Sequence, residues 1–210
     1  HLGGSVFPGD ELIARLAGIG AQLRVAVVDA CQSGALTREK GVRVGPGVRV
    51  ELLDDLAATG QAILASSGVG ESAQESEALQ GSFFTSHLVT GLRGAADANA
   101  DGEVGLREVY AYAYDRTVRA TVGSAAGIQH PSFSMRLSGK KDIGLTRPGQ
   151  SAAFLSFRAR SAGAFVVLTH NESAVVAEVP SQTDDPRRIG LRPGTYVVKK
   201  RSAHGLLVAQ

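Results

Sequence analysis

The sequence is poor in cysteine and in aromatic side chains. It contains one Cys, one Met and no Trp among 210 residues, and aromatic residues make up 5% of the chain. A single cysteine excludes an intramolecular disulfide, which suits a reducing compartment such as the cytoplasm and directs attention to thiol chemistry. The hydrophobic fraction of 43% is sufficient for a buried core, which must be mainly aliphatic.

An excess of charge of one sign is also absent. Lys and Arg number 22 against 20 Asp and Glu, which gives a net charge of +2. No strong electrostatic field is therefore present to attract a nucleic acid or a membrane surface. No apolar stretch approaches the length of a membrane span, and no signal-peptide pattern is found. Because the chain begins with His rather than Met, we expect a piece of a longer protein.

The chain divides into two regions of different pattern. Over residues 1–146, helical patterns alternate with apolar runs at 24–30 and 61–67, which predicts an α/β layered domain. The run 24–30 is apolar on both faces, as expected of a buried parallel strand. Over residues 147–210, short β-type runs separated by turn residues predict a small all-β module, which we expect to be truncated. Helices are predicted over 10–20, 82–94 and 106–121.

The only cysteine, Cys31, stands directly after the predicted strand 24–30, in the segment "VVDACQSGA". Functional groups in an open α/β sheet collect at the carboxyl ends of the strands. Asp29 and Gln32 beside the thiol are polar, and a Ser-Gly pair follows. This context favours a nucleophilic thiol, and a small buried thiol that serves only packing is the alternative.

The segment "VVDACQSGA" resembles the strand and nucleophile segment of the caspase-like cysteine peptidases of clan CD, in the bacterial metacaspase and orthocaspase branch. The resemblance continues through "AILASSGVGESAQES" and "IQHPSFSMRLSGKKDIGLT" and covers about residues 1–146. It implies a mostly parallel sheet flanked by helices, here without its N-terminal strands and followed by the β module. It also implies a Cys–His dyad that requires no cofactor. Cys31 would attack the scissile carbonyl, and its own N–H and that of a glycine would hold the oxyanion.

The dyad histidine is the missing part of this pattern. The family carries it in an upstream Ser-Gly-His turn, and no such turn occurs in the sequence. His1 is the only histidine before Cys31, and a strand–helix–strand crossover would bring their strand ends together. The alternative is a histidine that precedes residue 1, contributed by the upstream part of the same protein as a separate chain. His87 and His130 are expected to be structural or supporting residues.

Four polar residues are candidates for the substrate pocket. Asp29 shares the side of the strand that carries Cys31, and a carboxylate there would bind Arg or Lys of the substrate through charge-assisted hydrogen bonds. In metacaspases the corresponding aspartate lines this pocket. A carboxylate that only accepts from loop N–H groups is the alternative. The opposite wall is expected from the loop that carries Ser66, Glu71 and Glu75, unless this is simply a solvated acidic loop.

A second motif, "DANADGEVGLRE" at residues 97–108, matches the calcium loop of EF-hands. The predicted donors are side-chain oxygens of Asp97, Asn99 and Asp101, the carbonyl of Glu103, and both carboxylate oxygens of Glu108. Calcium is therefore a candidate ligand. A single unpaired loop is expected to bind it weakly, and an Asp/Asn/Gly turn before a helix that needs no metal is the alternative.

Three classes of function follow from these patterns. The first is a cysteine endopeptidase that cleaves protein substrates after Arg or Lys. The basic loop 36–50 is then a candidate site of self-cleavage, unless it is simply a flexible, solvated loop. The second is a caspase-like scaffold with an incomplete dyad, and the third is a calcium-responsive interaction module. A nucleic-acid or membrane partner is not expected.

Overall fold

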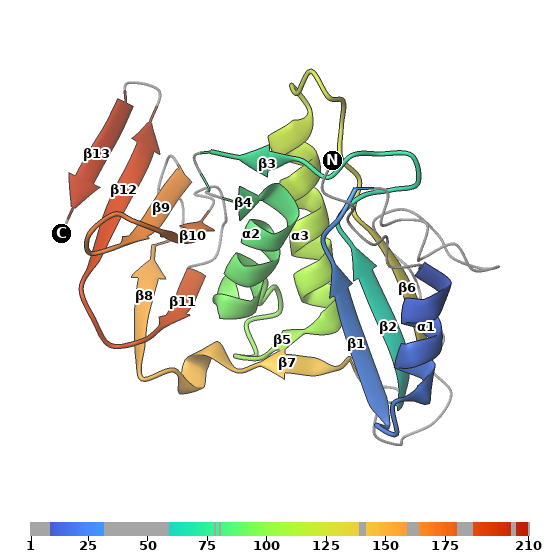
Figure 1. Ribbon diagram of the computed structural model, residues 1–210. Helices are drawn as coiled ribbons and strands as arrows, with labels where there is room; N and C mark the ends of the chain where they lie inside the picture. The colour runs from blue at the N-terminus through green and yellow to red at the C-terminus, as the bar shows by residue number, and fades with distance from the viewer. Residues whose placement is uncertain are drawn as a thin grey trace.

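The computed structural model describes residues 9–31, 59–77, 79, 81–138, 142–158, 164–179, 187–202 and 205–209. His1 and the basic loop 36–50 lie outside these ranges. In Figure 1 a group of C-terminal strands, a pair of helices and a three-stranded sheet follow one another as layers. Among the described helices, none is both long and apolar enough to cross a lipid bilayer.

The central sheet has three strands in the order β1–β2–β6. β1 (Leu23–Val28) runs parallel to β2 (Thr59–Ala65), and β6 (Ser132–Ser138) runs antiparallel to β2. The central strand is buried from Ala62 to Ala65, because its unbroken apolar run suits a strand that is covered on both faces.

The prediction of a mostly parallel sheet flanked by helices is wrong. Of the strand pairs in the described residues, only β1 and β2 are parallel. The reason lies between β2 and β6, where the chain makes two helical passes, through α2 (Phe83–Thr90) and back through α3 (Leu106–Thr121) (Figure 1). One helical pass would return the chain to the edge where β2 begins and give a parallel strand. The second pass carries it back to the edge where β2 ends, so β6 runs antiparallel.

The helices begin at recognisable caps. Ser82 is the N-cap of α2, and its hydroxyl accepts a hydrogen bond from the backbone N–H of Thr85 at 3.0 Å. Glu108 caps the start of α3, because its carboxylate accepts from the backbone N–H of Gly105 at 2.9 Å. The buried residues of α3 recur at helical spacing and form its buried face, which is mainly apolar: Leu106, Val109, Tyr110, Ala113, Thr117 and Thr121.

The first core cluster lies between the central sheet and the helix pair. Tyr110 of α3 packs edge-on against Phe133 of β6, with ring centroids 4.4 Å apart. Other buried members come from β2, α2 and α3, namely Ala62, Leu64, Phe84, Leu88, Val109 and Ala113. α1 (Gly9–Gly18) lies outside this cluster. Its C-terminal carbonyls accept hydrogen bonds from the guanidinium of Arg24 on β1.

The C-terminal strands form two antiparallel sheets. One has the order β10–β9–β12–β13, and the other pairs β11 with β8. Their bounds are Ala153–Phe157 (β8), Ala164–Thr169 (β9), Val175–Val179 (β10), Arg187–Leu191 (β11), Tyr196–Ser202 (β12) and Gly205–Ala209 (β13). The remaining short elements are β3 (Glu75–Ser76), β4 (Gly81–Ser82), the π-helix η2 (Gly91–Ala95), β5 (Val104–Gly105), β7 (Gly144–Thr146) and the 3-10 helix η3 (Pro148–Gln150).

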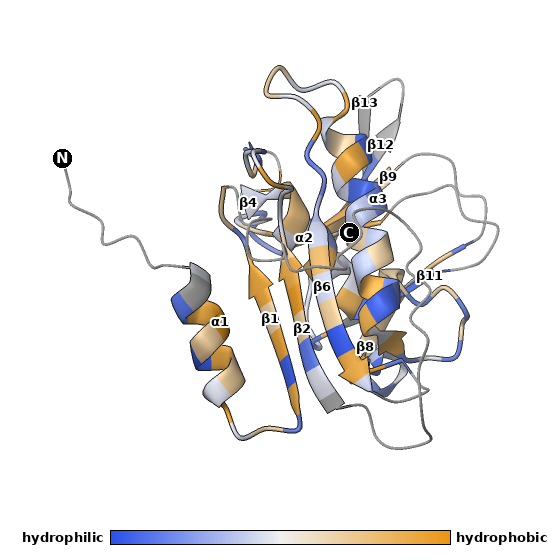
Figure 2. Cartoon of the chain, turned by 90° about the vertical axis from the view of Figure 1, so that its right-hand side faces the viewer, coloured by the Kyte–Doolittle hydropathy of each residue, from blue (hydrophilic) through white to orange (hydrophobic). Residues whose placement is uncertain are grey.

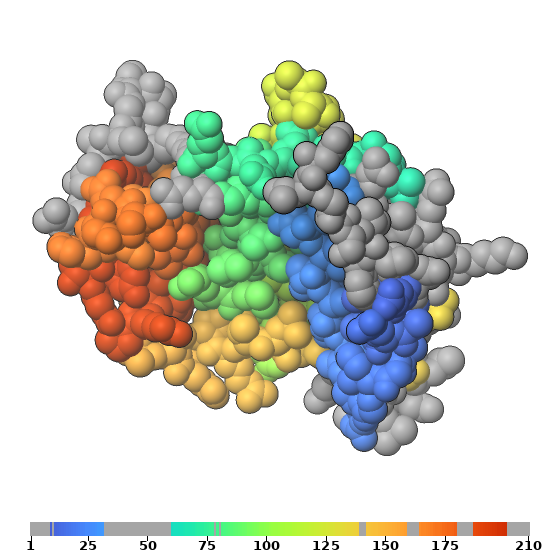
Figure 3. All heavy atoms as spheres, viewed as in Figure 1, coloured from blue at the N-terminus to red at the C-terminus, as the bar shows by residue number. Residues whose placement is uncertain are grey.

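These strands pack directly against the helix pair. A second core cluster joins Ala95 of η2 to Val167, Val179 and Ile189 of the strands, and Tyr112 of α3 packs against it. Figure 3 shows the orange and red atoms of this region lying against the green atoms of the helices. The helix pair is therefore a middle layer with an apolar cluster on each side.

Candidate active site

Three segments that are distant in the sequence meet at one end of the central sheet. Cys31 follows the carboxyl end of β1, and Ser66 follows the carboxyl end of β2. Ser132, at the start of β6, pairs with Ala65 at the end of β2. Because β6 is antiparallel, its first residues lie at the edge where β1 and β2 end. The structure thus gathers Cys31, Ser66 and the segment before β6 at one edge.

The backbone before Cys31 is held by the residues that follow β2. The N–H of Ala30 donates to the hydroxyl of Ser66 at 3.2 Å. The carbonyl of Ala30 accepts from the hydroxyls of Ser66 and Ser67, both at 3.4 Å. Both serines are fully buried, whereas Cys31 is exposed. The exposed Cys31 therefore follows a backbone segment that Ser66 and Ser67 hold in place through hydrogen bonds to Ala30.

Asp29 lies against the first turn of α2. Its Oδ2 accepts hydrogen bonds from the hydroxyl of Ser82 and from the hydroxyl of Thr85, the latter at 2.5 Å. The N-terminal end of a helix also carries a partial positive charge that favours a carboxylate. Asp29 is exposed, so its charge faces the same solvent as the thiol. Sequence reasoning missed Ser82 and Thr85 because they lie more than 50 residues away in the chain.

Glu75 lies on the same side of the β3–β4 ribbon as Ser82. The two residues are directly opposite in the antiparallel pair, and side chains of opposite residues emerge on one face, with Cβ atoms about 5 Å apart. The hydroxyl of Ser82 in turn donates to Asp29. Ser82 therefore links the two acidic residues: it is opposite Glu75 in the ribbon and donates to Asp29.

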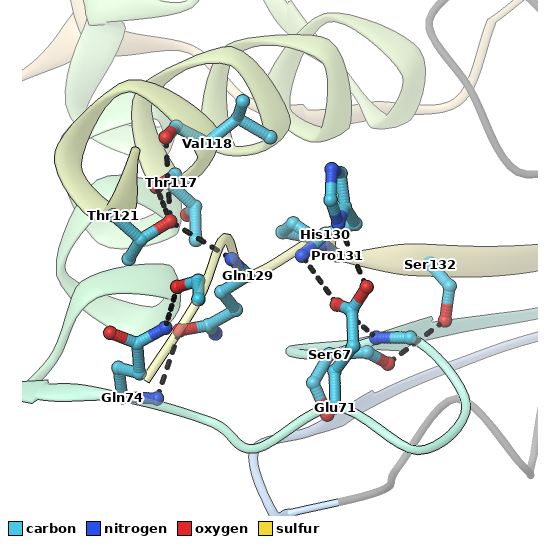
Figure 4. A network of polar contacts seen from close by, with 12 residues as sticks. Ser67, Glu71, Gln74, Thr117, Val118, Thr121, Gln129, His130, Pro131 and Ser132 are labelled. Atoms are coloured by element: carbon cyan, nitrogen blue, oxygen red, sulfur yellow. Dashed lines mark hydrogen bonds and ion pairs between the residues drawn. The ribbon is translucent and has the colours of Figure 1, made fainter. Parts of the chain in front are cut away.

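Glu71 is committed to internal contacts. One of its carboxylate oxygens accepts from the backbone N–H of His130 at 2.7 Å, and the other lies 2.8 Å from Nδ1 of the same residue. The backbone N–H of Gly68 donates to it at 3.3 Å. Figure 4 shows this carboxylate between its own loop and the segment that precedes β6. The structure thus gives Glu71 the role of tying two loops together.

Gln129 is a residue of the site that sequence reasoning missed. It is fully buried, its Nε2 donates to the carbonyl of Ser66 at 2.7 Å, and its Oε1 accepts from the backbone N–H of Gln74 at 2.9 Å. Its own N–H donates to the hydroxyl of Thr121 at the end of α3 (Figure 4). One amide therefore holds the loop after β2, the segment before β3 and the end of α3 together.

No described histidine forms a hydrogen bond with Cys31. His130 precedes β6, which is separated from β1 by β2. His87 is 1% exposed within α2, where burial lowers its pKa from 6.5 to about 4 and the Arg116 guanidinium acts in the same direction. His170 lies in the turn after β9. His1 lies outside the described residues, so its candidacy as the base stays a prediction.

The loop over residues 97–108 has the turn that its sequence predicts. Gly102 has φ of +82°, and its N–H donates to Oδ2 of Asp97 at 3.1 Å. The carboxylates of Asp101 and Glu108 likewise accept from backbone N–H groups. The short strand β5 inside the loop pairs with β7, and Glu103 forms an ion pair with Arg147.

This arrangement does not by itself form a metal cage. In the described part of the chain, no group of three or more His, Cys, Asp or Glu side chains is arranged to hold a metal ion. One oxygen, Oδ1 of Asp97, is buried without a hydrogen-bond partner. The other carboxylate oxygens cap the turn and the start of α3, so calcium binding stays a prediction.

Comparison with family models, with curated proteins and with solved structures gives no match to this chain.

Proposed function

We propose that the chain carries the nucleophile and the substrate pocket of a cysteine endopeptidase that cleaves protein substrates after Arg or Lys. The observation that carries the proposal is the exposed Cys31 on a fixed backbone, beside an aspartate held at a helix N-terminus. The cross-strand position of Glu75 supports a pocket with two carboxylates. Such a pocket attracts a cationic side chain and disfavours an acidic one.

The chemistry follows from the thiol. Sγ of Cys31 attacks the carbonyl carbon after the basic residue and forms a thioester, while the peptide C–N bond breaks and the leaving amine takes a proton. Water then adds to the thioester, which releases a carboxylate and restores the thiol. A general base that carries this proton must come from His1 or from the upstream part of the same protein. No metal or cofactor enters these steps.

The edge of β1 supports an upstream partner. In the described residues β1 pairs on one side only, with β2. Val25 and Val27 on this strand are 37% and 48% exposed, and β1 is coloured mostly as hydrophobic in Figure 2. An added strand would pair with the backbone N–H and C=O groups of this edge. We place the activity in a reducing compartment such as the cytoplasm, because the nucleophile must stay a free thiol.

The test compares the chain with its Cys31→Ala variant on peptides that carry Arg, Lys, Glu or Leu before the cut. Each is assayed with and without the upstream region of the same protein supplied as a second polypeptide. We expect cleavage after Arg and Lys only, and at least a thousandfold loss of kcat in the variant, as is typical on removal of a nucleophile. Turnover by Cys31→Ala, or a preference for Glu or Leu, would exclude this function. Absence of cleavage with the upstream region present would favour the scaffold.

A further inference from the structure

The two hydroxyls that bind Asp29 occupy the same carboxylate oxygen. Ser82 and Thr85 both donate to Oδ2, and within the described residues no hydrogen bond reaches Oδ1. A carboxylate oxygen has two lone-pair sites. Oδ2 is therefore fully used by the first turn of α2, and both sites of Oδ1 are left open by the part of the chain that the structure describes.

This occupancy restricts how Asp29 binds a cation. A guanidinium reaches its strongest contact with a carboxylate through two parallel N–H···O bonds, one to each oxygen. The ammonium of lysine is a compact charge that is satisfied by one oxygen. With Oδ2 closed, Asp29 offers Arg and Lys the same single oxygen, so the two side chains are treated alike at this position.

We infer that Thr85 is a specificity-determining residue: its hydroxyl closes Oδ2 of Asp29 and makes the pocket accept Arg and Lys with similar efficiency. This inference rests on the proposed endopeptidase function and concerns the same pocket. Thr85 does not touch the reacting atoms and acts only through Asp29. Ser82 keeps Asp29 against α2 when the hydroxyl of Thr85 is removed, because its own hydrogen bond to Oδ2 remains.

The variant Thr85→Val tests this directly. Valine has the shape of threonine without the hydroxyl, the position is exposed, and Val and Thr have similar helix propensities. Loss of the hydroxyl opens one lone-pair site on Oδ2, so Arg gains a second hydrogen bond and Lys gains none. We expect the ratio of kcat/KM for Arg over Lys substrates to rise about tenfold, mainly through a lower KM for Arg.

Thr85→Ser retains a hydroxyl on the same carbon and serves as the matched control, with a ratio close to that of the parent. The melting temperature and the rate of Cys31 alkylation by iodoacetamide should be the same in all three proteins. A parent that cleaves after Arg and Lys, with an unchanged ratio in Thr85→Val, would overturn the inference alone. A parent that cleaves after neither residue in the presence of the upstream region would overturn the proposed function together with it.

Discussion

Two buried polar side chains of this molecule differ in whether they have partners. Gln129 is fully buried, and both ends of its amide form hydrogen bonds. His87 is buried to the same degree, yet neither ring nitrogen has a partner among the described residues. A buried polar group without a hydrogen bond lowers the stability of the fold. His87 is therefore a weak point of the α2–α3 interface, and its effect depends on pH.

The replacement His87→Leu should reduce the sensitivity of the fold to acid. The pKa of His87 is about 4 in the folded chain, lowered first by burial and then by Arg116, against 6.5 when unfolded. Between these values the unfolded chain binds a proton that the folded chain does not, so stability falls as the pH drops from 6.5 to 4. At pH 5 this costs about 2 kcal/mol in the free energy of unfolding. Leu has no titratable group, so this loss of stability is absent in His87→Leu.

Urea unfolding at pH 7 and pH 5 measures this difference. The loss of stability between the two pH values should be about 2 kcal/mol smaller in His87→Leu than in the parent. His170 is exposed in a turn, so His170→Leu is the matched control and should leave the loss unchanged. An equal loss in parent and His87→Leu would show that another group governs the acid response.

At the scale of elements, helical and apolar patterns in the sequence predicted the positions of β1, β2 and α3. The direction of β6 depends on tertiary contacts. The apolar runs at 24–30 and 61–67 overlap β1 and β2 but extend two residues past the end of each, and the pattern at 106–121 coincides with α3. The position of Cys31 after a strand was also readable. The direction of β6 was not, because it depends on how many helical passes separate it from β2.

The rest of the candidate site could not be read from the sequence for the same reason. Glu71 was a candidate for the pocket, yet it contacts His130, which lies 59 residues away. Thr85 reaches Asp29 across 56 residues. Local pattern contains no information about such pairs, since they depend on how α2 and β6 pack against the ends of the strands.

The loop between η2 and α3 gives a prediction at this scale. If calcium binds the chain, it binds residues 97–108, where several oxygen donors and the turn at Gly102 coincide. We expect a Kd in the micromolar to millimolar range, because β5 pairs with β7 rather than with a second loop of this kind. Titration calorimetry with Asp97→Ala combined with Glu108→Ala should show no binding.

Glu103→Gln is the matched control for that experiment. The predicted ligand at this position is the backbone carbonyl, and the side chain is engaged with Arg147 instead, so binding should persist. Heat from the double variant equal to that of the parent would place the ion elsewhere. Absence of heat from the parent would identify the loop as a turn whose carboxylates serve only as caps.

At the scale of the whole molecule, α2 and η2 connect the candidate site to the C-terminal strands. The first turn of α2 binds Asp29, and its last residue, Thr90, accepts a hydrogen bond from the backbone N–H of Glu178 on β10 at 3.3 Å. Beyond it, Arg187 of β11 donates to the carbonyl of Asp97 at 2.7 Å. Hydrogen bonds therefore cross the proposed boundary between residues 146 and 147 and join the two regions of the chain.

Gly94 of η2 lies against the backbone of β11 and gives the prediction for the whole chain. It has φ of +124°, and a Cβ at this position would lie 2.4 Å from the carbonyl oxygen of Arg188 on β11. Gly94→Ala therefore combines a strained backbone with a clash between η2 and β11. Each of these effects costs about 1–3 kcal/mol, so the free energy of unfolding should fall by about 3 kcal/mol.

Ala95 and Tyr112 belong to the same apolar cluster as the C-terminal strands. The substitution should therefore destabilise the helix pair as well as β11. In hydrogen exchange, amides of α3 and of β11 are expected to lose protection together in Gly94→Ala, with one unfolding transition in urea. Gly149→Ala is the matched control, since a Cβ there meets no atom within 4 Å. Loss of protection in β11 with α3 unchanged would mean that the strands unfold as a separate unit. The layers on the two sides of the helix pair would then be independent, and α2 would not couple the strands to Asp29.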